Sequence, residues 1–247
     1  MTAPLFLADR GALDSAAPGE LVRVGGSEGH HAVSVLRLAL GESVLIGDGA
    51  GIRAQAEVVE LERSVLVARV LSVETEPPPE PSFVLVQALA KGDRDEQAVE
   101  AATELGVDAV VPWQAARNVV QWKAERAVRG QRRWEAVVVA ATKQSRRMRV
   151  PQVRPLARTA EIVDLVRSAA LAVILHEDAT APLAGVTLPE RGEVVVVVGP
   201  EGGIAPAELA ALEDAGGRVL RLGSTVLRSS SAGPAALAVL NAAGRWR

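Results

Sequence analysis

The sequence predicts a two-domain α/β protein, in which a small, mostly antiparallel β-barrel precedes a domain built on a parallel sheet. Up to residue 73, short strand-like segments alternate with turn residues, which is typical of a small barrel. After residue 81, apolar strands alternate with helices, which indicates a parallel sheet with helices on both faces. Between these regions, Glu74–Pro81 contains four prolines, which neither a helix nor a central strand accommodates. We therefore expect domains at 1–73 and 82–247, joined by a linker at 74–81.

In the first domain we expect one helical stretch, at 30–38, among four strands. The strands are residues 20–24, 43–47, 51–59 and 64–73. The second and third strands are separated by Gly47–Gly51, whose sequence Gly-Asp-Gly-Ala-Gly is typical of a hairpin turn.

In the second domain the positions of proline, glycine and apolar runs indicate where the strands and helices begin and end. Strands are expected at 83–90, 109–113, 171–175, 194–198 and 218–222, and helices at 94–105, 123–142, 159–168, 206–215 and 234–243. Pro206 and Pro234 suit the first position of a helix, and Gly106 and Gly216 suit C-terminal caps. Five consecutive valines at 194–198 predict a strand that is buried on both faces.

Composition excludes several classes of function. The chain of 247 residues has no Cys, so it forms no disulfide, thiolate nucleophile or Cys-zinc site. Its three His residues lack a spacing that suits a metal, and we expect none. No apolar run reaches the ~18–20 residues of a membrane span, and the start of the chain does not resemble a signal peptide, so we expect a cytoplasmic protein without membrane contact.

The charge is distributed unevenly along the chain. The formal net charge of −3 argues against a nucleic-acid partner, but residues 117–158 hold twelve basic and two acidic residues. One interpretation is a solvated helix face; the one we favour is a surface that binds a phosphate backbone. Trp122 and Trp134 lie among these charges and offer either stacking surfaces or, as we prefer, core anchors.

Three polar loops follow three of the expected parallel strands, where ligands of such sheets bind. They begin at His176, Gly199 and Gly223. The second loop, Gly199–Gly203, matches neither the dinucleotide fingerprint nor the P-loop, so a nucleotide-dependent oxidoreductase ranks last. Its glycines are explained either by close approach to a ligand or by the sterics of a tight turn. In the third loop, Ser231 is the expected N-cap of the helix at Pro234, and Ser229 and Ser230 are left open.

Taken together, these motifs resemble the SPOUT class of S-adenosylmethionine-dependent RNA methyltransferases. Within that class the chain is similar to the RsmE-type family, which methylates N3 of a uridine in the 16S ribosomal RNA of the small subunit. The resemblance spans the whole chain and rests on Leu175-His-Glu177, Gly199-Pro-Glu-Gly-Gly203, Leu222-Gly-x-x-Val-Leu-Arg228, Lys143-Gln-Ser-x-Arg147-x-x-Val-Pro151, Arg117-Asn-Val-Val120, Phe6-x-x-x-Arg10 and His30-His-x-x-x-Val-Leu-Arg37.

The resemblance implies a PUA-like barrel, a catalytic domain with a C-terminal trefoil knot, and a homodimer with the active site near the interface. It also implies that S-adenosylmethionine lies bent in the knot, held mainly by main-chain groups of the three loops. The implied cofactor-binding residues are Leu175, His176, Glu177, Gly199, Pro200, Glu201, Gly202, Gly203, Leu222, Gly223, Val226, Leu227 and Ser229.

Two residues are candidates for the chemistry. Arg228 can stabilise the negative charge that develops on the uracil carbonyl oxygens as N3 loses its proton. Glu201 is either the proton acceptor or a structural clamp on its own loop, and we favour the clamp. The family often carries a Glu two residues after the Arg; here that position is Ser230, so no role of that Glu is carried over.

For the RNA we expect contacts from six basic residues: Arg10, Arg37, Arg117, Lys143, Arg146 and Arg147. Two alternatives stay open beside the methyltransferase. One is a non-catalytic RNA-binding or ribosome-assembly factor with a degenerate site, and the other is a SPOUT methyltransferase that acts on another RNA base.

Overall fold

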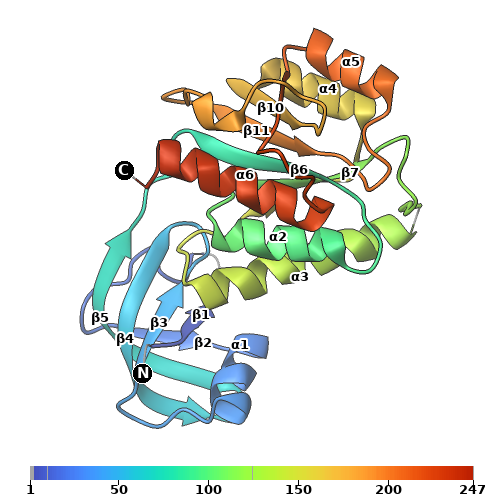
Figure 1. Ribbon diagram of the computed structural model, residues 1–247. Coiled ribbons are helices and arrows are strands. Elements are labelled where there is room, and N and C mark those ends of the chain that lie inside the picture. Colours follow the sequence, from blue (N-terminus) through green and yellow to red (C-terminus); the bar gives the residue numbers. More distant parts are fainter. Residues whose placement is uncertain (1–2, 10, 124, 247) are drawn as a thin grey trace. The chain divides into compact units, whose positions relative to one another are not determined.

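The computed structural model describes residues 3–9, 11–123 and 125–246, which form two compact units (Figure 1). Unit 1 comprises Met1–Pro78 and Thr142–Val150, and unit 2 comprises Pro79–Ala141 and Pro151–Arg247. The segment 142–150 therefore belongs to unit 1, whereas the sequence had placed it with the second domain. In the part of the chain that the structure describes, no helix is long and apolar enough to cross a membrane.

Unit 1 is built on a five-stranded sheet in the order β1-β3-β4-β5-β2. Strand β1 pairs with β3 in parallel and every other pair is antiparallel, as expected from the sequence. The strands are β1 (Leu5–Leu7), β2 (Leu21–Val24), β3 (Ser43–Gly47), β4 (Ile52–Glu62) and β5 (Val65–Thr75). A helical stretch is present, as α1 (Gly26–His30) and a π-helical turn, His31–Val35, but it begins four residues before the expected range 30–38 and ends three residues before its end. Phe6, Ile46 and Leu66 are buried in the core of this unit.

The hairpin between β3 and β4 turns at the predicted glycines. Gly49 and Gly51 have φ values of +67° and +114°, which L side chains rarely adopt. Asp48 closes the turn, because its Oδ1 accepts hydrogen bonds from the amides of Ala50 at 2.7 Å and Ile52 at 2.9 Å. The predicted turn is confirmed.

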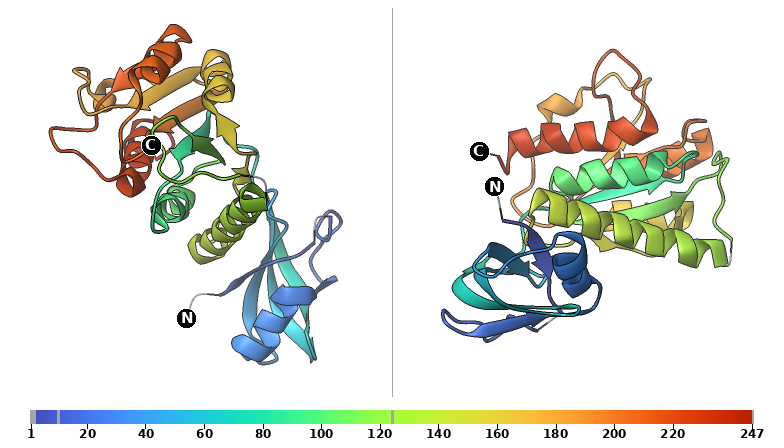
Figure 2. Two further views of the ribbon diagram at one scale, coloured as in Figure 1. Left: turned by 90° about the vertical axis from the view of Figure 1, so that its right-hand side faces the viewer. Right: turned by 90° about the horizontal axis from the view of Figure 1, so that it is seen from below.

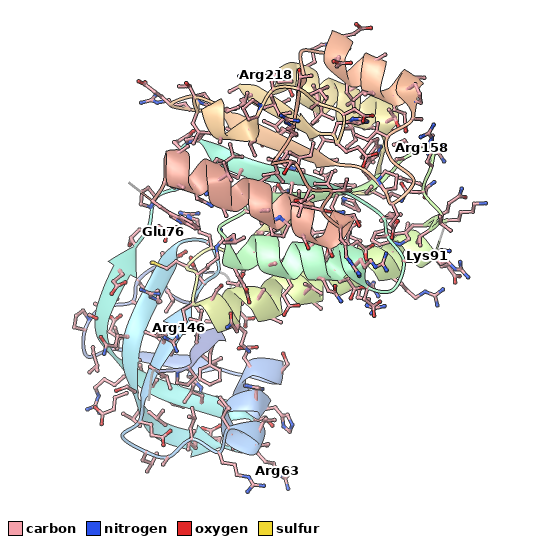
Figure 3. The ribbon with its side chains drawn as sticks, viewed as in Figure 1. Arg63, Glu76, Lys91, Arg146, Arg158 and Arg218 are labelled. Atoms are coloured by element: carbon pink, nitrogen blue, oxygen red, sulfur yellow. The ribbon has the colours of Figure 1, made fainter. Side chains whose placement is uncertain are left out.

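The segment 142–150 packs on this hairpin turn, which explains why it belongs to unit 1. The amide of Val150 donates to the carbonyl of Gly49 at 2.9 Å, and the amide of Gly51 donates to the carbonyl of Met148 at 3.2 Å. The side chain of Arg53 on β4 donates to the carbonyl of Arg146 at 3.1 Å (Arg146 is labelled in Figure 3). These bonds join residues about a hundred positions apart in the sequence.

Unit 2 contains a parallel sheet in the order β12-β10-β11-β6-β7-β8, and β9 pairs with β7 beside that path. Its strands are β6 (Ser82–Ala88), β7 (Ala109–Gln114), β8 (Gln152–Val153), β9 (Ala157–Arg158), β10 (Leu171–Leu175), β11 (Glu193–Val198) and β12 (Arg218–Leu220). Val194 to Val198 of β11 are all buried, so the prediction of a strand covered on both faces is confirmed.

Helices cover both faces of this sheet (Figures 1 and 2). Helices α4 (Thr159–Ser168) and α5 (Pro206–Asp214) pack on one face, where Ile162, Val166 and Leu212 join the core. Helices α2 (Arg94–Glu104) and α6 (Ser229–Ala243) pack on the other, and the last four residues of α3 (Glu125–Ser145) belong to the segment 142–150 of unit 1. Gly106 and Gly216 follow α2 and α5 with φ values of +89° and +100°, as expected of terminating glycines.

The predicted start of helix α6 is wrong. Helix α6 begins at Ser229 rather than Pro234, so Pro234 lies inside the helix and Ser231 lies in its first turn instead of capping it. The N-cap residue is Arg228, whose carbonyl accepts hydrogen bonds from the amides of Ser231 and Ala232. Pro234 is tolerated because it costs only the bond to the carbonyl of Ser230, at the start of the helix. Three short strands were not predicted: β1, which has three residues, and β8 and β9, which have two residues each.

Candidate active site

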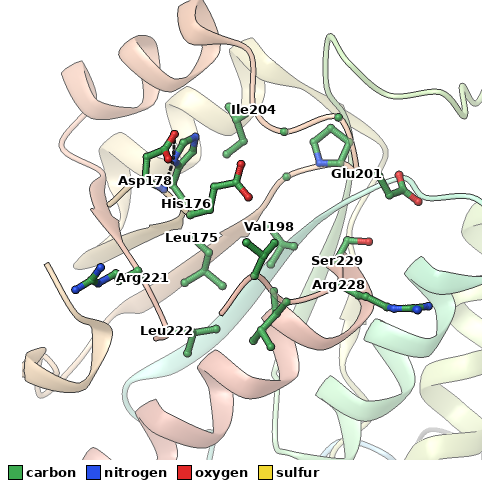
Figure 4. A pocket seen from close by; sticks show the side chains of 18 of the residues that line it. Leu175, His176, Asp178, Val198, Glu201, Ile204, Arg221, Leu222, Arg228 and Ser229 are labelled. Atoms are coloured by element: carbon green, nitrogen blue, oxygen red, sulfur yellow. Dashed lines mark hydrogen bonds and ion pairs between the residues drawn. The ribbon is translucent and has the colours of Figure 1, made fainter. Parts of the chain in front are cut away.

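A cavity of about 700 Å³ lies in unit 2 at the carboxyl ends of β10, β11 and β12 (Figure 4). The ends of these strands meet because Leu175 of β10 is in register with Val198 of β11 and with Leu220 of β12. The loops that follow the three strands therefore start side by side, as the sequence analysis expected. Together they form most of the cavity wall.

The structure brings the candidate cofactor and catalytic residues to this one cavity. Its lining includes Leu175, His176, Glu177, Gly199, Pro200, Glu201, Gly202, Gly203, Leu222, Gly223, Val226, Leu227, Arg228 and Ser229. It also includes Arg117, a candidate RNA contact, and Arg94, which the sequence analysis did not single out. Ser230, at the position where the family often has Glu, is not among the lining residues.

The second loop is a tight turn that needs its glycines for steric reasons. Gly203 has a φ of +73° and its amide donates to the carbonyl of Pro200 at 2.8 Å. A Cβ on Gly199 would lie 2.6 Å from Cγ1 of Ile204, and one on Gly202 would lie 3.4 Å from Cβ of Arg117. The glycines thus allow the loop to fold back on itself and to lie close to the neighbouring loop.

Glu201 joins the second loop to the connection between β6 and α2. Its Oε1 accepts a hydrogen bond from the amide of Lys91 at 3.3 Å and lies 3.6 Å from Nη1 of Arg94. The carboxylate is therefore already paired with a backbone donor and a guanidinium. This pairing supports the role of a clamp more than that of a free proton acceptor.

Arg117 belongs to the cavity wall, because its Nη1 donates to the carbonyl of Gly202 at 3.2 Å. Two buried polar side chains hold the loop that carries Arg117. Asn118 accepts from the amide of Ala115 at 2.6 Å and donates to the carbonyl of Leu89. Glu208 of α5 accepts from the amide of Ala116 at 2.8 Å and from the hydroxyl of Thr159 at 2.5 Å. Neither role was predicted, although Asn118 stands in one of the motifs and Glu208 stands three residues after the N-cap of α5.

The third loop places one charged and one buried polar group at the cavity. Arg228 is exposed, and it has no ion-pair partner in the described part of the chain. The hydroxyl of Ser229 is buried and has no hydrogen-bond partner among the described residues. A buried hydroxyl without a partner is unfavourable, so Ser229 is suited to bind a polar group of a ligand.

The cavity wall combines apolar and polar surfaces that suit a nucleoside-containing cofactor. Leu175, Val198, Ile204 and Leu222 provide apolar contacts, and the loop backbones and Ser229 provide polar ones (Figure 4). In the first loop, Nδ1 of His176 accepts from the amide of Asp178 at 3.2 Å, which holds that loop in a turn. No group of three or more His, Asp or Glu side chains in the described ranges is arranged to hold a metal ion.

Two carboxyl groups at the start of α2 are perturbed by burial. Burial raises the pKa of Asp95, although the carboxylate accepts from the amides of Ala90 at 3.4 Å and Glu96 at 3.0 Å. Burial also raises the pKa of Glu96, against the opposing effect of Arg133, whose Nε lies 2.7 Å from it. Neither residue was singled out from the sequence.

The remaining RNA candidates lie in unit 1, apart from Arg10, which falls outside the described residues. Lys143 forms an ion pair with Glu28 at 2.7 Å, with both side chains about one fifth exposed. Arg37 and Arg146 have φ values of +52° and +57°. Arg37 is exposed, whereas Arg146 and Arg147 are half-buried. The structure therefore divides the five described candidates between the two units, and Lys143 already has a partner.

Comparison with known families defines the class of protein. A family model described as an RNA methyltransferase domain matches residues 77–241, and one described as an RNA methyltransferase PUA domain matches residues 24–71. The chain is thus an RNA methyltransferase with a PUA domain, and that expectation is confirmed.

Individual relatives specify the family. The chain is 46% identical to the ribosomal RNA small subunit methyltransferase E of Mycobacterium tuberculosis, over 92% of this chain and 89% of that protein. It is 28% identical to the protein of the same name from Bacillus subtilis, over 87% and 88% of the two chains. The chain therefore belongs to the ribosomal RNA small subunit methyltransferase E family, and the resemblance seen in the motifs is confirmed.

Solved structures agree with this assignment. A ribosomal RNA small subunit methyltransferase E from Neisseria gonorrhoeae bound to S-adenosyl methionine superimposes with a TM-score of 0.86 at 28% identity, over 98% of both chains. A putative methyltransferase from Legionella pneumophila in complex with the same cofactor gives 0.85 at 26% identity, also over 98% of both chains.

Proposed function

We propose that this chain transfers the methyl group of S-adenosylmethionine to N3 of a uridine in the 16S ribosomal RNA of the small subunit. The observation that carries the proposal is the cavity at the carboxyl ends of β10, β11 and β12, with Arg228 at its wall. Membership of the methyltransferase E family supports it, as do two solved relatives that hold the cofactor.

In this proposal the main-chain groups of the three loops and the hydroxyl of Ser229 hold the cofactor. When bound, the cofactor supplies an electrophilic methyl group. The protein contributes position and electrostatics, which are the principal contributions to such a displacement. N3 lies on the Watson–Crick edge of uracil, so the target base enters the cavity unpaired.

Arg228 acts on the negative charge of the uracil ring as N3 loses its proton to water. Its guanidinium has no carboxylate partner among the described residues, so its positive charge is available to the carbonyl oxygens that flank N3. Glu201 acts as the clamp of the second loop, since its carboxylate already accepts a hydrogen bond from the amide of Lys91 and pairs with Arg94.

The same proposal includes the trefoil knot, the homodimer and a cytoplasmic location. Two hydrogen bonds support the knot: Arg221, directly after β12, donates to the carbonyl of Ala181 at 3.0 Å and accepts from the amide of Leu183 at 2.8 Å. The segment after β12 thus runs along the loop between β10 and β11. Exposed apolar side chains on the third loop, Val226 at 75% and Leu227 at 39%, support a partner copy at this site.

An Arg228→Ala variant tests the catalytic role. We expect methylation of 16S ribosomal RNA to fall by about 10²–10³-fold, as when one donor to a developing negative charge is removed, while calorimetry still detects cofactor binding. Mass spectrometry of the modified nucleoside measures the product. Full methylation by the variant contradicts the role of Arg228. A wild-type protein that gives no heat of binding with S-adenosylmethionine indicates the non-catalytic alternative, and a methylated nucleoside other than 3-methyluridine indicates a different base.

A further inference from the structure

The first half of helix α3, within the basic stretch 117–158, presents a row of arginines that are not among the six RNA contacts expected from the sequence. Arg126, Arg129 and Arg132 follow one another at intervals of three residues, which places them on one face of the helix. All three are exposed. None has a hydrogen-bond or ion-pair partner for its side chain among the residues that the structure describes, so their charges face solvent.

The carboxylates around this arginine face do not neutralise it. Within Glu125–Ser145 the two acidic residues are Glu125, in the first turn, and Glu135, which follows Arg132 by three residues at the other end of the row. Glu135 accepts a hydrogen bond from the side chain of Gln131 at 3.3 Å, and neither carboxylate forms an ion pair with the three arginines. At the start of α2, Asp93 and Glu96 form ion pairs with Arg133, at 3.0 Å and 2.7 Å. The exposed Glu100 and Glu104 lie further along α2, away from its start.

The start of α2 links helix α3 to the wall of the cavity. Arg94, the first residue of α2, lines the cavity and lies 3.6 Å from Glu201. One residue before it, Asp93 forms an ion pair with Arg133 of α3. Lys91, which is exposed, lies at the same end of unit 2 as the start of α3 (Figure 3). The helix that carries the three arginines is thus joined to the residue that precedes Arg94 of the cavity wall.

The segment that leads into α3 is fixed against the helix, so the face is held in place. The ring of Trp122 packs edge-on against buried Trp134, with their centroids 5.7 Å apart. A Cβ on Gly130 would lie 2.5 Å from the ring of Trp122, so only glycine allows this contact. The amide of Trp122 also donates to Oε1 of Gln114 on β7 at 2.9 Å.

We propose that Arg126, Arg129 and Arg132 bind the phosphates of the RNA strand that flanks the target uridine. The proposal rests on the proposed function, because it needs an unpaired strand that leaves the cavity. Arginine favours phosphate through its planar fork of donors, and side chains three residues apart on a helix lie about 5–6 Å apart, close to the spacing of successive phosphates. The six RNA contacts expected from the sequence include none of these residues.

The test compares two triple variants of the full chain. In the first, Arg126, Arg129 and Arg132 are changed to Gln. In the matched control, Arg167, Arg191 and Arg218 are changed to Gln; these are exposed residues of unit 2 that lie toward the amino ends of the sheet strands (Arg218 is labelled in Figure 3). The affinity for a protein-free fragment of 16S ribosomal RNA is measured by fluorescence anisotropy over a range of salt concentrations.

We expect the first variant to lose about tenfold or more in affinity at low salt. The slope of log affinity against log salt concentration should be less negative by about 2, because each of three phosphate contacts on a single strand contributes about 0.7 to that slope. The control variant should match the wild type, and replacement of the three arginines by Lys should restore most of the salt dependence. Calorimetry with S-adenosylmethionine and thermal melting check that the variants are folded.

Unchanged affinity and salt dependence in the first variant overturn the proposal. If that variant binds the protein-free RNA normally but loses affinity for the assembled small subunit, the face contacts an acidic protein surface, and the proposal is also overturned. Failure of the wild type to methylate RNA counts against the proposed function instead, since it does not depend on these three arginines.

Discussion

At the scale of single residues, the cavity wall depends on polar side chains that bind other parts of the protein. Glu201 accepts a hydrogen bond from the amide of Lys91, and Arg117 donates one to the carbonyl of Gly202. Asn118 and Glu208 hold the loop that carries Arg117. These bonds fix the loops before any ligand arrives, and fixed dipoles are what a site needs to stabilise a developing charge.

Two variants of Glu201 separate its two candidate roles. Glu201→Gln keeps an oxygen that accepts from the amide of Lys91, whereas Glu201→Ala removes it. If the residue is a clamp, the Gln variant should retain activity within about threefold and the Ala variant should lose about tenfold, because one hydrogen bond contributes about 1 kcal/mol. Steady-state kcat and KM on 16S ribosomal RNA are the measurement. A loss of about 10²-fold or more in both variants indicates a proton acceptor.

Asp95 should make stability depend on pH. Its pKa in the folded protein is raised from the ordinary value of 3.8 by burial, so the folded state binds a proton more readily than the unfolded state. Stability is therefore lost as pH rises from about 4 through the raised pKa. Asp95→Asn removes this loss, and the free energy of unfolding of the variant should increase relative to wild type as pH rises to 7.

Urea denaturation at a series of pH values measures this difference. Glu96, whose pKa is also raised, is present in both proteins, so its contribution largely cancels in the comparison. A difference between the two proteins that stays constant with pH contradicts the assignment.

At the scale of elements, the strands of the parallel sheet could be predicted because long apolar runs have no other place than a doubly covered sheet. The strand Leu171–Leu175 was predicted with its exact bounds, and β11 differs by one residue. The start of α6 could not be predicted, because proline is typical of the first turn of a helix but is also tolerated in the second turn, where Pro234 lies. The close packing of the helix was equally invisible in the sequence: a Cβ on Gly233 would lie 2.9 Å from Leu85, so α6 lies directly against the sheet.

Gly130 tests the packing of helix α3. Alanine in a helix normally stabilises by up to about 1 kcal/mol relative to glycine. Here the added Cβ would lie 2.5 Å from the ring of Trp122, so Gly130→Ala should instead destabilise by about 1–3 kcal/mol. Thermal unfolding and tryptophan fluorescence measure the effect.

Gly185→Ala is the control for this variant, because nothing lies within 4 Å of a Cβ at that position. Its effect should stay within about 0.5 kcal/mol. Equal or greater stability of Gly130→Ala shows that Trp122 does not depend on the close approach.

At the scale of the whole molecule, features that follow from local sequence patterns could be predicted, whereas features that depend on contacts between distant residues could not. The cofactor and catalytic candidates converge on one cavity because parallel strands in register end at the same edge, and this follows from topology. The membership of 142–150 in unit 1 rests on bonds to Gly49 and Gly51, far away in the sequence. The pairing of Lys143 with Glu28 is of the same kind, so a basic residue could be recognised as basic but not as already paired.

The third loop is fastened at both ends. Arg221 is bonded to the backbone of Ala181 and Leu183, and the carbonyl of Arg228 receives the first amides of α6. The residues from 222 to 227 are therefore a short bridge between two fixed points. Most of the entropy of closing that bridge is lost when the protein folds rather than when it binds, so a ligand that seats against it meets a backbone with little freedom left to lose.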